Sequence, residues 1–367
     1  MVLAVATALA SANKADAEVV TGVVCEALQN AGAEIAQSVL LFLTEDFARH
    51  AQVAVTAASR AGNCLQVIGC SAPGVFTERD WVLDRPGVAA MVFAAGVSIG
   101  AANGAHEPVL SLSTPAAATA SWLAARRQRF GMLSSSGSTQ KAGKIWVHAK
   151  TTADNRLDAV FHGANGAIGV SRGVRILTPA LEATHCDGYD VLRINGYPAL
   201  NTLIRELPLE LRDLPQLPVH QLCAGIIEDE SEDAIARCRY TLVPLIGANS
   251  DERSVTLAAK IAPSTRMFWA VRSPLAGERD TRVMLDELDS TLPGAPDFGI
   301  MFSCMGRGPY FYDGADRDLE LVRSRYPRMP LIGAYGSGEI APQFDGNKII
   351  HNCAVLSLFR GARNGNV

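Results

Sequence analysis

The first seventy residues alternate between short apolar runs and amphipathic segments, and this alternation constrains the fold more than any other feature of the chain. Residues 3–9, 39–43 and 65–68 are short apolar runs of the kind that form strands. Residues 13–30 and 44–61, which lie between them, carry apolar side chains at helical spacing. The order strand–helix–strand–helix–strand predicts a sheet that helices cover on at least one face.

Later parts of the chain are richer in expected strands. Residues 88–97 form a continuous apolar run that predicts a buried strand, residues 115–128 predict a helix, and residues 134–143 predict a polar loop. In the second half we expect paired strands at 253–261 and 265–271, helices at 275–292 and 316–326, and strands at 297–303, 331–335 and 349–359. No repeat of fixed period is visible in the sequence.

Composition narrows the class of protein. The 367 residues favour about two domains, and 48% apolar against 19% charged residues supply a packed core. A net charge of −4 argues against a nucleic-acid binder, and no apolar run approaches the ~20 residues that span a bilayer. No Lys or Arg precedes the apolar residues 2–12, so the positive region of a signal peptide is missing. We therefore expect no membrane and no nucleic-acid partner.

Eight cysteines are scattered along the chain without a closely spaced pair. Structural zinc sites and small disulfide frameworks both depend on regular cysteine spacing, which is missing here. In a chain of this size the pattern indicates reduced thiols and a cytoplasmic location, with no metal site.

The most specific motifs lie in the C-terminal half. One strand closes on Phe302-Ser303-Cys304-Met305-Gly306-Arg307-Gly308. Residues 330–342 follow as an apolar strand that ends in Tyr335-Gly336-Ser337-Gly338-Glu339, and His351-Asn352 then precedes a last apolar strand. This ordered set resembles the C-terminal FIST module, which is named from F-box and intracellular signal transduction proteins.

Two weaker segments extend the resemblance over nearly the whole chain. Gly69-Cys70-Ser71 is similar to the corresponding turn of an N-terminal FIST module, and residues 192–199 are similar to the segment that opens the C-terminal module. The resemblance implies a FIST N-terminal module at residues 1–177 and a FIST C-terminal module at residues 178–367. It also implies a mixed α/β fold in which each module brings a sheet with covering helices, the sheets stacking as an α-β-β-α sandwich.

The same resemblance implies a function. The family is regarded as a sensory, signal-transduction module that binds small molecules, amino acids among them, and some bacterial members bind haem and respond to nitric oxide. We accordingly expect a free-standing sensory protein that binds an amino acid or another small carboxylate and acts through a signalling partner. A haem-binding nitric-oxide sensor, a cysteine-dependent enzyme and a ligand-free interaction scaffold are the alternatives.

The residues themselves suggest where the ligand binds. Gly306 and Gly308 leave backbone amides uncovered next to Cys304, and such a turn can present N–H groups to an anion. The planar charge of Arg307 suits a carboxylate, and Glu339 can hold an ammonium group. The alternative is a tight turn in which Arg307 pairs with a structural acid such as Glu339.

We also assign Tyr335, Gly336, Gly338 and Cys70 to this ligand site, since all four stand at strand ends near glycines. The enzymatic alternative uses Cys304 as a nucleophile, with Arg307 favouring the thiolate. Its base is His351 or Glu339. A buried, inert cysteine is the commoner state, so the sequence favours a non-enzymatic role. Haem requires an axial side chain, and the sequence does not indicate which of the seven histidines would be the axial ligand.

Overall fold

The computed structural model describes residues 3–102, 108–134, 143–292, 294–343 and 346–362, so most of the loop expected at 134–143 lies outside the described residues. The chain divides into two compact units, with Met1–Arg172 and Asp280–Val367 forming unit 1 and Gly173–Arg279 forming unit 2. Both units contain sheets and helices, which confirms the mixed α/β class. The division into modules at residues 1–177 and 178–367 stays a prediction.

Unit 1 begins with the expected alternation of strands and helices. The helix starts at Asp16, whose side chain accepts a hydrogen bond from the backbone N–H of Glu18, and ends at Gly32 in the left-handed conformation. The first stretch, which we call repeat 1, contains β1 (Ala4–Ser11), α1 (Ala17–Ala31), β2 (Ser38–Thr44), η1 (Glu45–His50), α2 (Ala51–Ala61), β3 (Val67–Ala72), β4 (Gly74–Thr77), β5 (Trp81–Leu83) and β6 (Gly87–Ala95).

Two further stretches of unit 1 use the same order of strands. Repeat 2 contains β7 (Ser98–Gly100), β8 (Val109–Ser113), η2 (Pro115–Ala117), α3 (Ala120–Leu123), β9 (Arg129–Leu133), β10 (Ile145–Val147), β11 (Lys150–Thr151) and β12 (Arg156–His162). Repeat 3 contains β13 (Ala164–Ser171), α6 (Pro274–Thr291), β22 (Phe298–Cys304), η4 (Pro309–Tyr312), α7 (Arg317–Arg325), β23 (Leu331–Gly336), β24 (Glu339–Gln343), β25 (Gly346–Ile350) and β26 (Ala354–Gly361). Unit 2 is inserted between β13 and the part of α6 that belongs to unit 1.

The described residues of unit 1 build three six-stranded sheets with one shared topology. The strand orders are β1-β6-β2-β3-β10-β11, β7-β12-β8-β9-β24-β25 and β13-β26-β22-β23-β4-β5. In each sheet the second and third strands of one repeat are parallel neighbours, and the outer edge is a hairpin from another repeat. The hairpin β4–β5 of repeat 1 lies in the sheet of repeat 3, and the hairpin β24–β25 of repeat 3 lies in the sheet of repeat 2. The hairpin β10–β11 of repeat 2 lies in the sheet of repeat 1. Unit 1 therefore has a pseudo-threefold arrangement of strands.

A glycine marks the same position in each repeat. Gly69, Gly131 and Gly333 are the third residues of β3, β9 and β23, and each is the register partner of a residue in the parallel neighbour. A Cβ atom at these glycines would lie 1.8, 1.7 and 2.3 Å from the carbonyl oxygen of Leu41, Ser111 and Met301. Only glycine permits this close approach of two backbones.

The core of unit 1 lies between the three sheets. It contains Phe93, Phe161 and Phe359, which occupy equivalent positions in β6, β12 and β26. The rings of Phe93 and Phe161 are 5.6 Å apart, and those of Phe161 and Phe359 are 4.7 Å apart. These contacts show that the inner faces of all three sheets meet in one apolar cluster.

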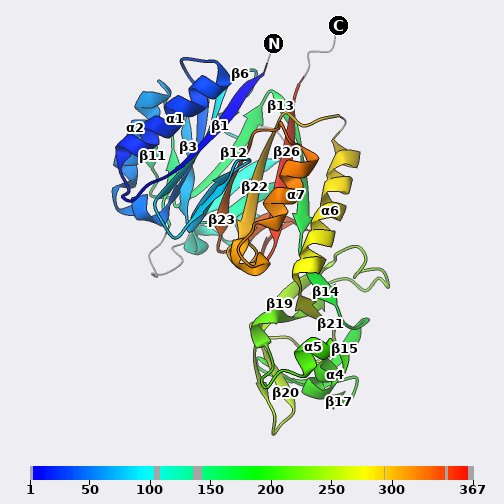
Figure 1. Cartoon of the computed structure of the whole chain (residues 1–367). Coiled ribbons are helices and arrows are strands. Elements are labelled where there is room, and N and C mark those ends of the chain that lie inside the picture. The colour runs from blue at the N-terminus through cyan, green and yellow to red at the C-terminus, as the bar shows by residue number, and fades with distance from the viewer. Residues whose placement is uncertain (1–2, 103–107, 135–142, 293, 344–345, 363–367) are drawn as a thin grey trace. The chain divides into compact units, whose positions relative to one another are not determined.

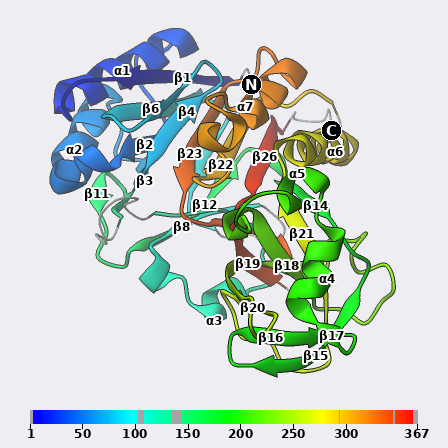
Figure 2. The same ribbon diagram turned by 60° about the horizontal axis from the view of Figure 1, so that its bottom comes forward.

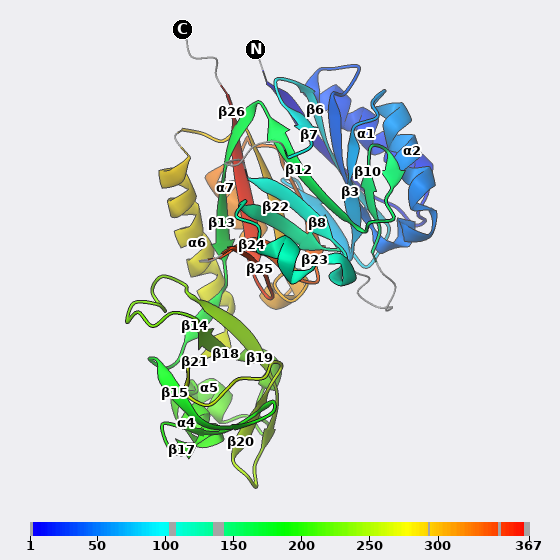
Figure 3. The same cartoon turned by 180° about the vertical axis from the view of Figure 1, so that it is seen from behind.

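Helices cover the outer faces of two of these sheets (Figures 1 and 2). α1 and α2 pack on the sheet of repeat 1, and α7 with the unit 1 part of α6 packs on the sheet of repeat 3. These two sheets with their helices form the expected α-β-β-α order. Figure 3 shows the third sheet from behind, and among the described residues the helix that packs on it is the short α3.

Unit 2 is built around a closed antiparallel sheet, in which β18 pairs with both β19 and β21. Trp269 and the other apolar side chains in the interior form its core, against which α4 packs. Its elements are β14 (Val174–Ile176), β15 (Leu181–Asp187), β16 (Asp190–Ile194), β17 (Tyr197–Pro198), α4 (Ala199–Glu206), α5 (Leu209–Arg212), η3 (Val219–Gln221), β18 (Leu222–Ile227), β19 (Tyr240–Asn249), β20 (Ser254–Leu257) and β21 (Thr265–Arg272).

Three expectations about elements are wrong. The helix expected at 115–128 is reduced to η2 and α3, because Thr119 caps a new start at Ala120 and the segment after Leu123 turns back toward β9. The closing strand expected at 349–359 is two strands, β25 and β26, separated by a bend at Asn352, which has a φ of 57°. β20 and β21 do not pair with each other within unit 2. No helix of the described chain is long and apolar enough to cross a membrane.

Candidate functional site

Cys304, the last residue of β22, lies opposite Cys353, which precedes β26. The pairing of Ser303 with Ala354 continues by one step, and the backbone N–H of Cys304 donates to the carbonyl of Cys353 at 2.9 Å. Residues opposite each other in an antiparallel pair project their side chains from the same face. The two thiols therefore emerge side by side where β22 ends.

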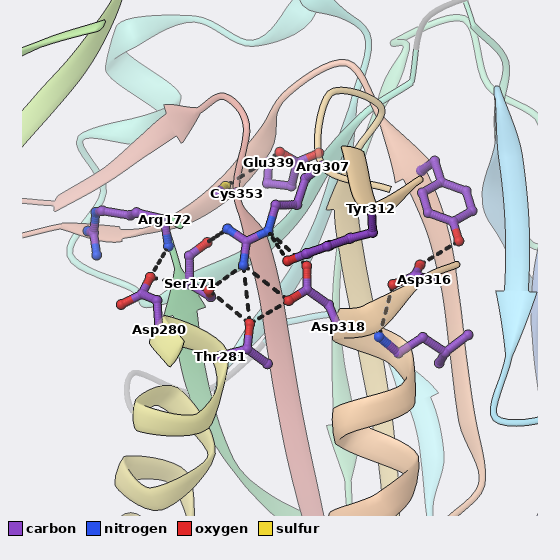
Figure 4. A network of polar contacts seen from close by, with 12 residues as sticks. Ser171, Arg172, Asp280, Thr281, Arg307, Tyr312, Asp316, Asp318, Glu339 and Cys353 are labelled. Carbon is purple, nitrogen blue, oxygen red and sulfur yellow. Dashed lines mark hydrogen bonds and ion pairs between the residues drawn. The ribbon is translucent and has the colours of Figure 1, made fainter. Parts of the chain in front are cut away.

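Glu339, the first residue of β24, completes this arrangement. Its register partner across the sheet is Met132 of β9, and its side chain is fully buried. The thiol of Cys353 donates to Oε2 of Glu339 at 3.4 Å, and the nearby thiol of Cys304 acts to lower the pKa of this carboxyl group. Cys304, Glu339 and Cys353 thus form one cluster, which we call the carboxyl–thiol cluster; Figure 4 shows Glu339 with Cys353.

The other carboxyl oxygen, Oε1 of Glu339, has no hydrogen-bond partner among the described residues. Gly336 makes room for it, since a Cβ atom at Gly336 would lie 2.8 Å from Oε1 and 3.0 Å from Cβ of Met132. A buried acceptor without a donor costs free energy, and such atoms in native proteins call for an explanation.

Burial keeps the cluster uncharged. It raises the pKa of Glu339 well above its usual range, against smaller opposing contributions from Cys353, Cys304 and Arg307. Burial also raises the pKa of Cys353, and the neighbouring Glu339 and Cys304 add to that effect. The favoured state of Glu339 and Cys353 is a neutral carboxylic acid in contact with a neutral thiol.

The two other repeats show that the fold does not need these residues. Glu339 pairs with the residue after the repeat glycine Gly131, and the equivalent positions are Val75 and Ile145, both fully buried and apolar. Cys304 corresponds to Thr44 and Thr114, and Cys353 corresponds to Gly87 and Asn155. The backbone bond from Thr114 to Asn155, also 2.9 Å, repeats the one between the cysteines. A buried carboxyl group beside two thiols is specific to repeat 3.

Arg307, expected at the ligand site, is buried in a network of protein groups (Figure 4). Its Nε donates to Asp318 Oδ2 at 2.8 Å and to the Tyr312 hydroxyl at 3.1 Å, and Nη1 donates to the carbonyl of Ser171. Its Nη2 donates to the hydroxyls of Ser171 and Thr281 and to Asp318 Oδ1. The acid that pairs with Arg307 is Asp318 on α7 and not Glu339.

Tyr335 also has its partner on the α7 side of the sheet. Its hydroxyl donates to Asp316 Oδ2 at 2.6 Å, while Oδ1 of Asp316 caps α7 by accepting from the N–H of Leu319. Burial raises the pKa of Asp316 to about 6, and the nearby Asp318 adds to the shift. Tyr335 therefore anchors the start of α7 through Asp316.

The glycine turn after Cys304 directs its amides inward. The N–H groups of Arg307 and Gly308 both donate to the carbonyl of Cys304, at 2.7 and 3.0 Å, and the N–H of Met305 donates to the carbonyl of Gly336. Gly306 lies half-buried between them. These bonds satisfy amides that the sequence analysis assigned to an anion.

The remaining predicted residues lie in two places. Gly338 is next to the carboxyl–thiol cluster, where its carbonyl accepts from the N–H of Leu133 at 2.8 Å. Cys70 lies on β3 in the apolar core between the sheets, and burial raises the pKa of its thiol. The structure thus brings together Cys304, Gly336, Gly338 and Glu339.

Cys353 was not singled out from the sequence as a site residue. The available signal was positional, because it stands just before the closing strand, and pairing that strand with the one ending at Cys304 places the two cysteines opposite each other. Asp318, the ion-pair partner of Arg307, carried no signal, since it resembles any acidic residue in the first turn of a helix.

The described residues include no cluster suited to a metal ion, and the two histidines that flank strands, His162 and His351, do not suit haem. No group of three or more His, Cys, Asp or Glu side chains in the described chain is arranged to hold a metal ion. Haem needs an axial side chain in an apolar pocket. His351 is exposed, with Nδ1 at 3.1 Å from the carbonyl of Ser337, and His162 is half-buried beside Gly100. Neither histidine fits that requirement, so we derive no haem chemistry.

The class of protein is α/β: unit 1 contains three strand repeats, and unit 2, a closed antiparallel sheet, is inserted in the third repeat. Comparison with known proteins finds a family match for part of the chain. Residues 199–342 match the family model of the FIST C domain, in agreement with the resemblance of the C-terminal motifs. FIST domains are associated with sensory and signal-transduction proteins. The comparisons do not show an N-terminal FIST module.

Two mycobacterial proteins are similar to this chain. The uncharacterized protein Rv0628c of Mycobacterium tuberculosis is 27% identical over 198 residues, which cover 54% of this chain and 51% of that protein. The uncharacterized protein Mb0898c of Mycobacterium bovis is 28% identical over 198 residues, with the same coverage. The chain thus spans about half the length of the curated relatives it matches.

Proposed function

We propose that this protein is a sensory protein that binds a small polar ligand at the carboxyl–thiol cluster of unit 1. The observation that carries the proposal is Oε1 of Glu339, a fully buried carboxyl oxygen that has no hydrogen-bond partner among the described residues. In repeats 1 and 2 the same position holds an apolar side chain. A buried carboxyl group retained where the fold accepts valine or isoleucine is explained by a ligand that supplies the missing partner.

The ligand class we propose is a small molecule that carries a hydrogen-bond donor, with amino acids as the first candidates. An ammonium group would donate to Oε1 and favour the ionised form of Glu339, which compensates for part of the cost of burying the charge. The donors of Arg307 are engaged with Asp318, Ser171, Thr281 and Tyr312. The proposal therefore assigns the ligand's ammonium group to Glu339 and gives Arg307 no part in binding.

A cytoplasmic location and a protein partner complete the proposal. None of the eight cysteines, all of which lie in the described residues, forms a disulfide, as is usual in a reducing compartment. Most of the exposed large apolar side chains belong to unit 2, among them Tyr189, Tyr197, Leu209 and Ile246. Exposed aromatic and aliphatic side chains suit the surface of a signalling partner.

Thermal unfolding in the presence of amino acids and small amines tests the proposal. A ligand at one hundred times its dissociation constant stabilises the folded state by ~2.7 kcal/mol, which gives a measurable rise in Tm. Glu339→Val uses the residue found at the equivalent position 75 and should remove the rise. Glu320→Gln, which changes an exposed carboxylate on α7, is the matched control and should keep it. A rise that survives in Glu339→Val would place the ligand elsewhere.

A further inference from the structure

The two cysteines of the cluster have the geometry of a cross-strand pair. The N–H of Cys304 donates to the carbonyl of Cys353, which is one of the two backbone bonds of a hydrogen-bonded antiparallel pair, while the carbonyl of Cys304 accepts from Arg307 and Gly308. The Cα atoms of such a pair are about 5.5 Å apart. Disulfides join Cα atoms roughly 4.4–6.8 Å apart, so a bond between Cys304 and Cys353 needs no large backbone movement.

A shared carboxyl group brings the sulfur atoms to the same side. Glu339 accepts a hydrogen bond from the thiol of Cys353 at 3.4 Å, and the thiol of Cys304 is near enough to lower the pKa of the same carboxyl group. Both sulfur atoms therefore lie within reach of one acidic group that can give a proton to a leaving group and regain one from a thiol.

The pair is absent from the two equivalent places in the fold. Repeat 1 has Thr44 opposite Gly87, and repeat 2 has Thr114 opposite Asn155. Threonine, glycine and asparagine satisfy the same backbone positions, so two facing cysteines are not a requirement of the strand ends. Because the two cysteines occur together with the buried Glu339 in repeat 3, we infer a reactive role for the pair.

Burial limits which oxidant can react. Cys304 is 6% exposed and Cys353 is fully buried. A bulky disulfide cannot approach a thiol this enclosed, whereas a hydroperoxide of one or two heavy atoms beyond its oxygens can. Cys304, the more accessible of the two, is then the residue attacked first, and Cys353 is the resolving thiol.

We propose that Cys304 and Cys353 form a dithiol site that small hydroperoxides oxidise to a disulfide. The sulfur of Cys304 attacks one peroxide oxygen, the O–O bond breaks, and the products are a sulfenic acid and either water, from hydrogen peroxide, or the alcohol of an alkyl hydroperoxide. The sulfur of Cys353 then attacks the sulfenic sulfur, forming the S–S bond and releasing water. Two electrons pass from the dithiol to the peroxide, and Glu339 supplies a proton to each leaving hydroxide or alkoxide and recovers it from the thiols.

This inference deepens the proposed function, because it adds a redox input to the same cluster. Formation of the disulfide removes both thiol donors from Glu339 and so changes the site that the ligand would contact. The two ideas can fail separately, since ligand binding is measured on the reduced protein and disulfide formation is measured without ligand.

The test is to treat the reduced full-length protein with hydrogen peroxide, block the remaining thiols and map disulfides by peptide mass spectrometry. We expect a peptide pair joined through Cys304 and Cys353, formed at lower peroxide than oxidation of the exposed Cys25. Cys353→Asn, which copies repeat 2, should accumulate a sulfenic acid at Cys304 that a dimedone-type probe detects. Cys304→Thr, which copies both other repeats, should leave Cys353 reduced.

The disulfides mapped in the wild-type protein test the proposal even where a variant fails to fold. Oxidation of Cys25 while Cys304 and Cys353 stay reduced would overturn the proposal. A disulfide from either cysteine to a different partner would overturn it as well. If the disulfide forms but no amine or amino acid shifts the Tm, the dithiol site stands and the proposed ligand function fails.

Discussion

Oε2 of Glu339 accepts a hydrogen bond from the thiol of Cys353 at 3.4 Å, while Oε1 of the same carboxyl group has no partner among the described residues. One half of the side chain is thus held by a weak donor and the other half is left unsatisfied in a fully buried place. Such an arrangement is a cost to the folded state, and this cost can be measured.

Glu339→Val should stabilise the ligand-free protein. The variant removes a buried, partly unsatisfied carboxyl group and introduces the residue that repeat 1 carries at this position. The expected gain is about 1–3 kcal/mol, the cost of an unsatisfied buried polar group. For unit 1 this corresponds to roughly 2–4 °C in Tm for each kcal/mol. A lower Tm for this variant would mean that Glu339 contributes net stability, and the argument from the repeats would fail.

The stability difference between the wild type and Glu339→Gln should depend on pH. The pKa of Glu339 is raised in the folded state, so the folded protein binds more protons than the unfolded chain once the pH exceeds the ordinary pKa of glutamate. The wild type therefore loses stability as pH rises from that value to the raised folded pKa. Glutamine cannot titrate, so its advantage should grow over this window and then level off. A difference independent of pH would show that Glu339 ionises as freely as in the unfolded chain.

Sequence reasoning reached the class of fold and part of the site. The alternation in the first seventy residues predicted β1 to β3 with α1 and α2, and the glycine bends after Cys304 and Tyr335 indicated where polar groups gather. The prediction of these strands and helices depends on local pattern and is confirmed, while the ligand site at the glycine bends stays a prediction. The partner of Arg307 depends on how α7 packs against the sheet, and local pattern contains no information on that contact.

The threefold repetition could not be predicted from the sequence, and the reason is physical. The repeats share strand order and one sterically required glycine, at positions 69, 131 and 333, while most other core positions accept any apolar side chain of suitable size. Unit 2 interrupts repeat 3, and repeat 2 has only the short α3 where the others have longer helices. Because the three repeats differ in length, the sequence has no fixed period. The repeats become visible only from the pairing of the strands.

Arg307→Met should destabilise unit 1 strongly. It leaves Asp318, which is fully buried, without the guanidinium that neutralises it. Breaking a buried ion pair from one side costs about 3–5 kcal/mol. Chemical denaturation followed by a probe in unit 1 gives the measurement. The double variant Arg307→Met with Asp318→Leu should recover most of the loss, because it removes both charges together.

The same double variant separates two roles of Arg307. If the residue is structural, the folded double variant should still show the ligand-dependent rise in Tm that depends on Glu339. Loss of that rise in a variant of normal stability would restore the carboxylate-binding role that the sequence suggested for Arg307.

Gly336→Ala should disturb the cluster without removing any of its functional groups. The added Cβ atom would lie 2.8 Å from Oε1 of Glu339 and 3.0 Å from Cβ of Met132, both closer than ordinary contacts. The carboxyl group must then move, so we expect a reduced ligand-dependent rise in Tm and slower formation of the Cys304–Cys353 disulfide. Gly22→Ala on α1 is the control, because nothing lies within 4 Å of its Cβ position and alanine is favoured in a helix by roughly 0.5–1 kcal/mol. Equal behaviour of the two variants in both assays would show that the position of Oε1 has no bearing on the site.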